Sequence, residues 1–328
     1  MHTEDVVPGA GAPLTVLVTG ANGFVGSALC AELLRRNHRV RAVVRKACAT
    51  IRCTDQVIVD AMDVTTDWST ALQGIDVVVH LAARVHVMHE TDRNPLEKFR
   101  QTNVEGSLHL ARCAARAGVK RFVYMSSVKV NGEETHSGKP FTEVDAIGPL
   151  DPYGVSKAEA ECGLKLIAQS TPLELVIIRP PLVYGPGVKA NFASLMRAVA
   201  KGWPLPLAAV RNRRSLVALD NLVDFVITCL AHPQAANQIF LVSDGEDVST
   251  PDLIRGLARA QGVAPRLFWF PVPLLRGLAV LAGKRMAVER VCGDLQVDVS
   301  KARNLLQWVP PVSVEEGLRR AAGDTPRL

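Results

Sequence analysis

The chain has 328 residues, of which 48% are hydrophobic, 21% are charged and 5% are aromatic. This composition is typical of a soluble globular protein with one large or two modest domains, and the scarcity of aromatic rings argues against a nucleic-acid surface built on base stacking. The formal net charge of +6 is spread along the chain apart from an arginine cluster at 211–214, so we interpret it as a solvated basic surface.

The seven cysteines are odd in number and include no CxxC pair, which predicts reduced thiols, no disulfide framework and a cytoplasmic location. Residues 1–13 lack the apolar core of a signal peptide and predict a flexible tail. The apolar segment 271–283 is too short to span a bilayer, so we expect no integral membrane segment. It predicts a buried amphipathic helix, with a helix lying on a membrane surface as the alternative.

The first predicted element is a strand that runs into a glycine-rich turn and then into a helix at 24–36. Gly20 allows the tight turn, Gly23 lets the backbone approach a pyrophosphate, and Gly26 lets the helix pack closely on the strand. The helix N-terminus would present unpaired N–H groups and the positive end of its dipole to the phosphates. The pattern is that of a βα turn that binds a dinucleotide.

Strand-like and helical segments then alternate along the chain. Predicted strands cover 14–19, 39–44, 56–60, 76–81, 120–126, 173–179 and 238–242, and the longest helices cover 95–118 and 152–171. This alternation predicts an α/β fold of Rossmann type, a doubly wound parallel sheet of about seven strands with helices on both faces. After residue 180 prolines increase and the segments are mostly helical, which predicts a smaller C-terminal substrate lobe.

The second strand ends at Arg45 and Lys46, where an NAD site usually carries an acidic residue for the adenosine ribose. A cation at this point suits the 2′-phosphate of NADP(H), and a guanidinium can also stack on adenine. The alternative is a solvated arginine at a strand end. We expect NADP(H) to be favoured, with NAD(H) as the second choice.

The next two strand ends carry further candidate contacts. Asp63 follows the third strand, where a carboxylate can meet the adenine amino group or, equally, cap the next helix. Ala82 and Ala83 follow the fourth strand and are small enough to let the backbone approach a cofactor, although they also suit a routine helix entry. We predict no metal site, because the nearby histidines form no metal-like set with carboxylates: His80, His86 and His89.

Reactive side chains follow the fifth strand. Ser126 and Ser127 stand at its carboxyl end, where open α/β sheets bind ligands. Tyr153 and Lys157 are four residues apart and therefore share one face of a helix. A neighbouring ammonium favours the phenolate, so Tyr153 can exchange a proton with a substrate oxygen that Ser127 also binds. The alternative, a packed tyrosine, a surface lysine and a capping serine, does not explain why they occur together after the glycine turn.

These motifs resemble the extended class of the short-chain dehydrogenase/reductase superfamily, the NAD-dependent epimerase/dehydratase family. The matching motifs run from Thr15 to about Leu318 and read TGANGFVG, HLAAR, TNVEGS, SSVKVNG, YGVSK and RPPLVYGPG. Within this class the chain is similar to nucleotide-sugar enzymes related to UDP-glucose 4-epimerase. Two stretches, SSVKVNGEET and RRSLVALDNLVD, are most similar to 4-keto reductases and epimerases of bacterial O-antigen and capsule synthesis.

The resemblance implies roles for individual residues. Tyr153 is the implied catalytic acid/base, Lys157 lowers its pKa and holds the nicotinamide ribose, and Ser127 is the implied catalytic serine. The implied cofactor contacts are Gly20, Asn22, Gly23, Phe24, Val25, Gly26, Arg45, Asp63, Val64, Leu81, Ala82, Ala83, Asn103, Tyr153, Lys157, Pro180 and Val183.

The substrate implied by the resemblance is a UDP-sugar. Arg214 and Asn191 are implied to bind its diphosphate, and Ser127 its reacting oxygen. Residues 14–183 and 213–250 would form the dinucleotide-binding domain, and residues 184–212 and 251–328 the nucleotide-sugar-binding lobe. The segments 95–118 and 152–171 fall where relatives form a four-helix dimer interface, so we expect a homodimer. The small residues Ala111, Ala114 and Ala115 suit such an interface, although packing within one chain explains them equally.

The chain departs from the family pattern at three positions. Arg45 stands where UDP-galactose-type epimerases usually have an acidic residue, Leu182 where they usually have asparagine, and Asn131 where a tyrosine is usual. An NADP(H)-favouring site tilts the interpretation toward reduction. We therefore expect an NADP(H)-dependent reductase of the C4 ketone of a UDP-linked 6-deoxy-N-acetylhexosamine in bacterial surface polysaccharide synthesis.

Three alternatives stay open. The first is an NAD-dependent 4-epimerase of a UDP-hexose or UDP-N-acetylhexosamine. The second is a reductase of a small ketone without a nucleotide, which would leave Arg214 without a phosphate partner. The third is a non-catalytic dinucleotide sensor, which the Tyr153–Lys157 pair argues against, because sensors of this fold usually lack it.

Overall fold

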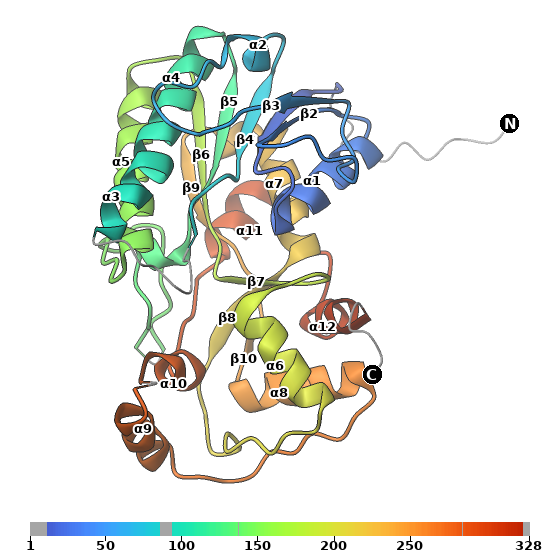
Figure 1. The fold of residues 1–328 in the computed structure, drawn as a ribbon, viewed down its shortest axis with the longest axis vertical. Coiled ribbons are helices and arrows are strands. Elements are labelled where there is room, and N and C mark those ends of the chain that lie inside the picture. The colour runs from blue at the N-terminus through green and yellow to red at the C-terminus, as the bar shows by residue number, and fades with distance from the viewer. Residues whose placement is uncertain (1–11, 86–93, 137, 284, 324–328) are drawn as a thin grey trace, which may run out of the picture.

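The computed structural model describes residues 12–85, 94–136, 138–283 and 285–323. Its centre is a sheet of seven parallel strands in the order β3-β2-β1-β4-β5-β6-β9 (Figure 1). The strands are β1 (Thr15–Thr19), β2 (Arg39–Val44), β3 (Asp55–Ile58), β4 (Val77–His80), β5 (Arg121–Met125), β6 (Glu174–Arg179) and β9 (Gln238–Leu241). The predicted Rossmann-type fold is confirmed, and the order reverses between β1 and β4, where such sheets bind ligands.

Helices cover both faces of this sheet, as its buried apolar strands require. The side chains of α1 (Phe24–Arg35), α7 (Leu219–Ala231) and α11 (Ser300–Leu306) share one core with the sheet. The opposite core includes α2 (Ser69–Leu72), α4 (Ser107–Arg116) and α5 (Pro152–Gln169). Between α3 (Pro95–Phe99) and α4 the helical run widens into a π-helix, η1 (Arg100–Gly106), a local distortion that often occurs at functional sites.

The second lobe is built on a small sheet that the helical prediction did not include. This sheet has the order β10-β8-β7 and consists of β7 (Leu182–Tyr184), β8 (Arg214–Ala218) and β10 (Asp247–Val248). Against it pack α6 (Ala190–Ala200), α8 (Thr250–Gln261) and α12 (Val314–Gly323), which share a separate apolar core. Short 3₁₀ turns η2 (Val128–Val130) and η3 (Pro233–Ala235) complete the elements outside α9 and α10. The division of the chain into two domains stays a proposal.

The apolar segment at 271–283 forms α9 (Val272–Leu281), followed by α10 (Arg285–Cys292). The expectation of a buried helix is wrong. Ala279 is the buried residue of α9, whereas Leu274, Leu278 and Leu281 are 59%, 55% and 85% exposed. Sequence hydrophobicity predicted the helix but not its surroundings, because neighbouring elements leave most of its surface uncovered.

Within the described ranges, no helix has the length and apolarity needed to cross a membrane. All seven cysteines are free thiols. The described residues contain no group of three histidine, cysteine or acidic side chains that could hold a metal ion. His86 and His89 lie outside the described residues.

Candidate active site

The glycine turn after β1 lies against the end of β4. Gly20 has φ +67°, and a Cβ added there would lie 2.9 Å from the backbone nitrogen of Ala82. A Cβ on Gly26 would lie 2.1 Å from the carbonyl oxygen of Gly20, so the start of α1 packs directly on the turn. Gly23 is the N-cap of α1 and is exposed, and as a glycine it offers no side chain to cap the helix. The uncapped N–H groups and helix dipole form a cradle that fits a pyrophosphate.

A chain of buried hydrogen bonds ties this turn to η1. The hydroxyl of Thr19 lies 2.7 Å from Nδ1 of His80, whose Nε2 lies 2.8 Å from the hydroxyl of Ser107. Ser107 in turn donates to the carbonyl of Asn103 at 2.7 Å. Burial, with the positive charge of Lys157 as a second cause, lowers the pKa of His80 to about 3, so its imidazole is neutral. His80 is therefore a fixed connection between β1, β4 and η1.

Asn103 holds the backbone beyond β4 in place. Its Oδ1 accepts from the backbone N–H of Arg84 at 2.8 Å, and its Nδ2 donates to the Arg84 carbonyl at 3.0 Å. The same Nδ2 lies 3.0 Å from the hydroxyl of Ser156 on α5. Asn103 is 1% exposed and sits in the π-helix. It links the segment after β4 to the helix that carries Tyr153 and Lys157.

Lys157 lies in the interior beneath the end of β5. Its ammonium donates to the carbonyl of Met125 at 2.7 Å and lies 4.5 Å from the ring centre of Tyr124 and 5.9 Å from that of Tyr153. Burial lowers the pKa of Lys157 to about 7, and the negative charge of Glu161 opposes this shift. The ammonium is thus held where a small change in its surroundings alters its charge near neutral pH.

Tyr153 lies one helical turn before Lys157 and packs edge-on against Phe99. Burial raises the pKa of its phenol, and the negative charge of Asp151 adds to this shift. Burial therefore favours the protonated phenol. The expected effect of the Lys157 ammonium on this phenol stays a prediction.

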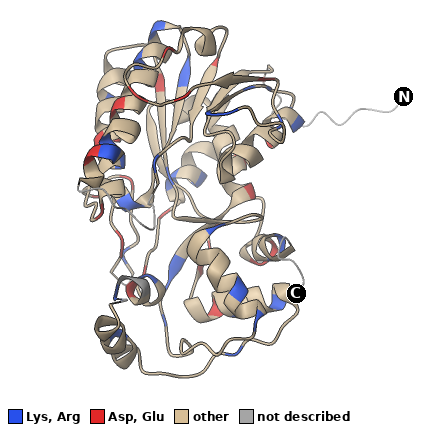
Figure 2. Cartoon of the chain, in the orientation of Figure 1, with Lys and Arg blue, Asp and Glu red and all other residues tan. Residues whose placement is uncertain are grey.

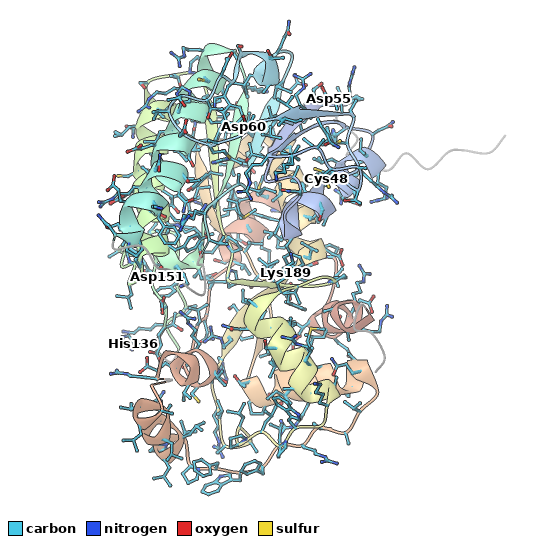
Figure 3. The ribbon with its side chains drawn as sticks, viewed as in Figure 1. Cys48, Asp55, Asp60, His136, Asp151 and Lys189 are labelled. Carbon is cyan, nitrogen blue, oxygen red and sulfur yellow. The ribbon has the colours of Figure 1, made fainter. Side chains whose placement is uncertain are left out.

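Ser127 is placed by the start of α5. Its side chain accepts from the backbone N–H of Lys129 at 3.3 Å, which caps η2. The ammonium of Lys129 forms ion pairs with Glu133 and Asp151, and Asp151 caps α5 by accepting from the N–H of Gly154 at 2.7 Å. Lys129 therefore clamps the serine segment to the first turn of the helix that carries Tyr153. Figure 3 labels Asp151 close to the level at which the second lobe begins.

The other serine of the pair has a structural partner. The hydroxyl of Ser126 donates to Glu161 at 2.5 Å, and Glu161 forms a bidentate ion pair with Arg179 at 2.9 and 2.5 Å. Arg179 also donates to Oδ1 of Asn131 at 3.1 Å, and Asn131 donates to the carbonyl of Thr142. Asn131, which stands where a tyrosine is usual, thus belongs to this buried network. Ser127 is half-buried and lies outside this network.

The predicted adenine-side residues lie at the ends of β2 and β3. Arg45 follows β2, is exposed, and forms no ion pair with any residue in the described part of the chain. The carboxylate of Asp63 accepts from the N–H and hydroxyl of Thr65 at 2.8 and 2.7 Å, bonds that lower its pKa. Asp63 therefore stabilises a local turn, whereas Asp67 caps the start of α2 by accepting from Ser69. Val64 is 54% exposed.

The other predicted cofactor residues follow strand ends of the same edge. Leu81, Ala82 and Ala83 come directly after β4 and are half-buried, and the N–H of Ala82 donates to the hydroxyl of Thr19 at 3.2 Å. Pro180 follows β6 and accepts from the N–H of Val128 at 3.0 Å. The remaining members lie in the turn, the first part of α1 and β7: Asn22, Phe24, Val25 and Val183.

The predicted substrate residues lie in the second lobe. Arg214 begins β8 and donates to the carbonyl of Gly293 at 3.0 Å. Burial lowers its pKa, and the charges of Asp294 and Glu134 oppose that shift. Asn191 is exposed in the first turn of α6, after Ala190, whose φ of +56° is unusual for a residue with a side chain.

A cavity of about 340 Å³ lies beside Arg214. Its wall includes Gly293, which binds Arg214, and Glu134, which follows the serine segment. Arg211 and Arg276 also line it, together with the carboxylates of Glu134 and Asp294, so its wall carries charges of both signs.

The sequence did not predict the buried hydrogen-bond networks or the part that five residues play in them: His80, Ser107, Glu161, Arg179 and Asn131. Glu161 lies four residues after Lys157, the same spacing that identified the Tyr153–Lys157 pair. Arg179 is a charged residue at the end of an otherwise apolar strand, which indicates that a buried partner of opposite charge is needed. Both signals were visible, but only the folded chain brings the two residues together.

The chain is similar to known proteins over most of its length. A family model described as "NAD dependent epimerase/dehydratase family" matches residues 16–243. A relative from Vibrio cholerae, "UDP-glucose 4-epimerase", is 46% identical over 316 residues, which cover 94% of this chain and 95% of the relative.

Two further proteins are similar over their full lengths. An Escherichia coli O157:H7 protein, "N-acetyl-alpha-D-glucosaminyl-diphospho-ditrans,octacis-undecaprenol 4-epimerase", is 28% identical over 319 residues, or 93% of each chain. The crystal structure of a UDP-glucuronic acid 4-epimerase from Bacillus cereus in complex with UDP-glucuronic acid and NAD superposes with a TM-score of 0.76 at 25% identity. It covers 95% of this chain and 98% of its own.

Proposed function

Because this chain belongs to the NAD-dependent epimerase/dehydratase family, we propose that it is an NAD-dependent 4-epimerase of a UDP-linked hexose or N-acetylhexosamine. The observation that carries the proposal is the 46% identity to the Vibrio cholerae UDP-glucose 4-epimerase across nearly the full length of both chains. The Bacillus cereus epimerase, whose structure holds a UDP-sugar and NAD, supports the same class of substrate and cofactor.

The residues at the strand ends fit a dinucleotide. The uncapped N-terminus of α1 would bind the pyrophosphate, and the absence of a side chain at Gly23 leaves its backbone open to it. Ala82 and Ala83 would face the ring system, and Lys157 the nicotinamide ribose. When bound, the nicotinamide supplies reversible two-electron oxidation at C4 of the sugar.

The protein's own part in the reaction is to move one proton and orient the sugar. Oη of Tyr153 would accept the proton of the C4 hydroxyl as the sugar is oxidised and return it after the keto sugar has turned. The ammonium of Lys157 would stabilise the phenolate that accepts this proton, and Ser127 would hydrogen-bond the C4 oxygen. Asn103 and the Lys129–Asp151 clamp would keep these groups in register.

Recognition of the UDP part would fall to the second lobe. Arg214 and the cavity beside it offer cations for the diphosphate, and Asn191 offers an amide from the start of α6. We propose the same division of labour for the two domains. Residues 14–183 and 213–250 would bind the cofactor, and residues 184–212 and 251–328 would bind the UDP-sugar.

The expected NADP(H)-dependent 4-reductase is the weaker candidate. It depended on Arg45, and an exposed arginine at a strand end can be solvated without contacting a 2′-phosphate. The similar proteins described above are named as epimerases, and the Bacillus cereus structure contains NAD. We therefore propose NAD as the cofactor and epimerisation as the reaction.

A homodimer through α4 and α5 is part of the proposal. Ala111 and Ala114 are buried in the core of their own chain, so they do not argue for it. The exposed Leu166 of α5 would be covered in such a dimer.

The test is incubation of the purified protein with UDP-glucose or UDP-N-acetylglucosamine, with and without NAD, followed by proton NMR of the sugar. Formation of the C4 epimer supports the proposal. A protein that forms no epimer from either sugar, but consumes NADPH with a 4-keto sugar, is the reductase instead.

A further inference from the structure

The outer surface of α9 is apolar although it faces away from the protein. Leu274, Leu278 and Leu281 lie at positions i, i+4 and i+7 of the helix, which places them on one face. Ala279 and Val272 lie on the opposite face, where Ala279 is buried and Val272 lines the cavity beside Arg214. The helix therefore turns its leucines outward, the reverse of a helix that packs on a core.

Aromatic side chains are also exposed on the segment that leads into α9 and on the segment paired with it. Trp203, Phe268 and Trp269 are 58%, 45% and 70% exposed. They are neighbours, because Leu205 pairs with Leu267 in a short β-bridge that joins the segments carrying them. We name the outer patch as the set Trp203, Phe268, Trp269, Leu274, Leu278 and Leu281. In Figure 1 the segment from α8 to α9, and α9 itself, lie at the end of the molecule away from the sheet.

The sequence that carries α9 is rich in basic residues. The 36 residues at 253–288 contain six lysines and arginines and no acidic residue. Arg255 and Arg285 pair with carboxylates that flank this stretch, Asp252 and Glu289. Arg266 lies beside Gly202, and the ammonium of Lys201 lies 6.0 Å from the ring centre of Trp203. Figure 2 shows α9 as an almost uncharged helix next to α10, which carries both basic and acidic residues.

Leucines and tryptophans that face outward among arginines and lysines are the composition of a helix that lies in the interface of an anionic membrane. We propose that the outer patch binds the surface of an anionic phospholipid bilayer, with α9 lying along it. At ten residues α9 is about 15 Å long, too short to cross a bilayer but long enough to bury its leucines between headgroups. A second copy of this chain is disfavoured as the occupant, since it would bring two basic surfaces together.

The position of the outer patch determines how the bound protein would be oriented on the membrane. Val272 and Arg276 of α9 also line the cavity beside Arg214. A protein held through α9 would thus present its second lobe to the membrane and keep the sheet away from it. The inference does not depend on the reaction that the active site catalyses.

Intrinsic fluorescence tests the proposal directly, because of the four tryptophans Trp68 and Trp308 are only 1% and 6% exposed. Trp203 and Trp269 therefore report on the outer patch. The full-length protein is mixed with vesicles of equimolar phosphatidylglycerol and phosphatidylcholine, and with vesicles of phosphatidylcholine alone. We expect co-sedimentation and a blue shift with the anionic vesicles, quenching when their acyl chains are brominated, and binding at least about tenfold weaker to the neutral ones.

The matched variants carry two added acidic side chains each. Leu278→Glu with Leu281→Glu should weaken vesicle binding at least about tenfold, because both side chains would enter the interface. Val144→Glu with Val309→Glu changes two residues that are 92% and 64% exposed elsewhere and should leave binding unchanged. Thermal melting and turnover of a soluble substrate verify that both variants are folded.

Two outcomes overturn the proposal. One is wild-type protein that stays in solution with anionic vesicles, or that binds them as tightly after the α9 substitutions. The other is an α9 variant that changes the sedimentation coefficient of the protein without vesicles, which would make the outer patch an interface between copies.

Discussion

The carboxylate of Glu161 holds the guanidinium of Arg179 at 2.5 Å in the protein interior, one helical turn beyond Lys157. The two side chains are 0% and 2% exposed, and Ser126 and Asn131 complete their hydrogen bonds. The pair joins α5 to the end of β6 directly below the candidate catalytic residues. The negative charge of Glu161 also raises the pKa of Lys157. The same buried network therefore serves both the fold and the proposed chemistry.

Replacement of Tyr153 tests the proposed proton transfer. Tyr153→Phe should lower epimerase turnover about 10²–10⁴-fold, the usual contribution of a general acid/base, while UDP-sugar and NAD bind as before. Turnover is followed by NMR and binding by calorimetry. Tyr124→Phe is the matched control, because it removes a buried phenol next to Lys157 and should keep activity. Full turnover in Tyr153→Phe would remove the residue from the mechanism.

Replacement of Glu161 separates the electrostatic role of the network from its structural role. Glu161→Gln leaves Arg179 buried without a counter-charge and should cost about 3–5 kcal/mol of unfolding free energy. It also removes the charge that raises the pKa of Lys157, so the ammonium should be lost at lower pH and the alkaline limb of the kcat/KM profile should move to lower pH.

The double variant Glu161→Gln with Arg179→Gln removes both charges and should recover part of the lost stability. Because the side chain at position 161 is still uncharged in this variant, the alkaline limb of its kcat/KM profile should stay at lower pH. A pH profile identical to that of the wild type in both variants would show that Glu161 is only a packing residue.

Lys157 should make the stability of the protein depend on pH. Its pKa in the folded state is lowered from 10.5 to about 7, so between these values the unfolded chain holds the extra proton. The free energy of unfolding therefore rises with pH across this window. The full cost of burying the charged ammonium is present below about pH 7. Lys157→Met removes that cost. Its melting temperature should exceed that of the wild type at pH 6, by about 2–4 °C for each 1 kcal/mol relieved, and the difference should shrink toward pH 10. A difference that does not vary with pH would contradict this account.

The packing of α1 on the glycine turn can be tested at one methyl group. Gly26→Ala places a Cβ 2.1 Å from the carbonyl oxygen of Gly20, so the turn must shift. We expect a loss of about 1–3 kcal/mol in stability and weaker binding of NAD. Gly277→Ala is the control, because this helical glycine has no atom within 4 Å of an added Cβ. It should be neutral or stabilise by up to about 1 kcal/mol in thermal melts. Equal melting temperatures for the two variants would contradict the close packing.

Cofactor choice can be measured on the protein as purified. We expect the dinucleotide released by denaturation to be NAD, identified by cycling assays specific for NAD and for NADP. Arg45→Asp should then leave NAD binding within a few-fold of the wild type, because the side chain is exposed and unpaired in the described part of the chain. Release of NADP, or a large loss of affinity for NADPH in Arg45→Asp, would instead support the interpretation made from the sequence.

Local signals predicted the parts of the fold that depend on short stretches of sequence. The apolar runs predicted all seven parallel strands. The three glycines predicted the turn, in which positions 20 and 26 have no room for a Cβ. The Tyr153–Lys157 spacing placed both residues on α5. These features follow from periodicity and backbone conformation, which neighbouring residues determine.

Features made by distant residues could not be predicted in this way. The pairing of Glu161 with Arg179, the chain from Thr19 through His80 to Ser107, and the small second sheet each depend on segments far apart in the chain. The outward face of α9 is a further case, since hydropathy predicts an apolar helix but not which surface the rest of the chain leaves uncovered. The preference for one cofactor or reaction rested on the single residue Arg45, whose role depends on what it contacts.

The most direct test of the central claim is the fate of UDP-glucose incubated with the purified protein and NAD, followed by proton NMR of the anomeric signals. We expect UDP-galactose to appear, the mixture to reach a constant ratio from either sugar, and no net NADH to accumulate. Sugars that stay unchanged from both directions, together with stoichiometric oxidation of NADPH on addition of a UDP-4-keto-6-deoxy sugar, would contradict it and identify a reductase.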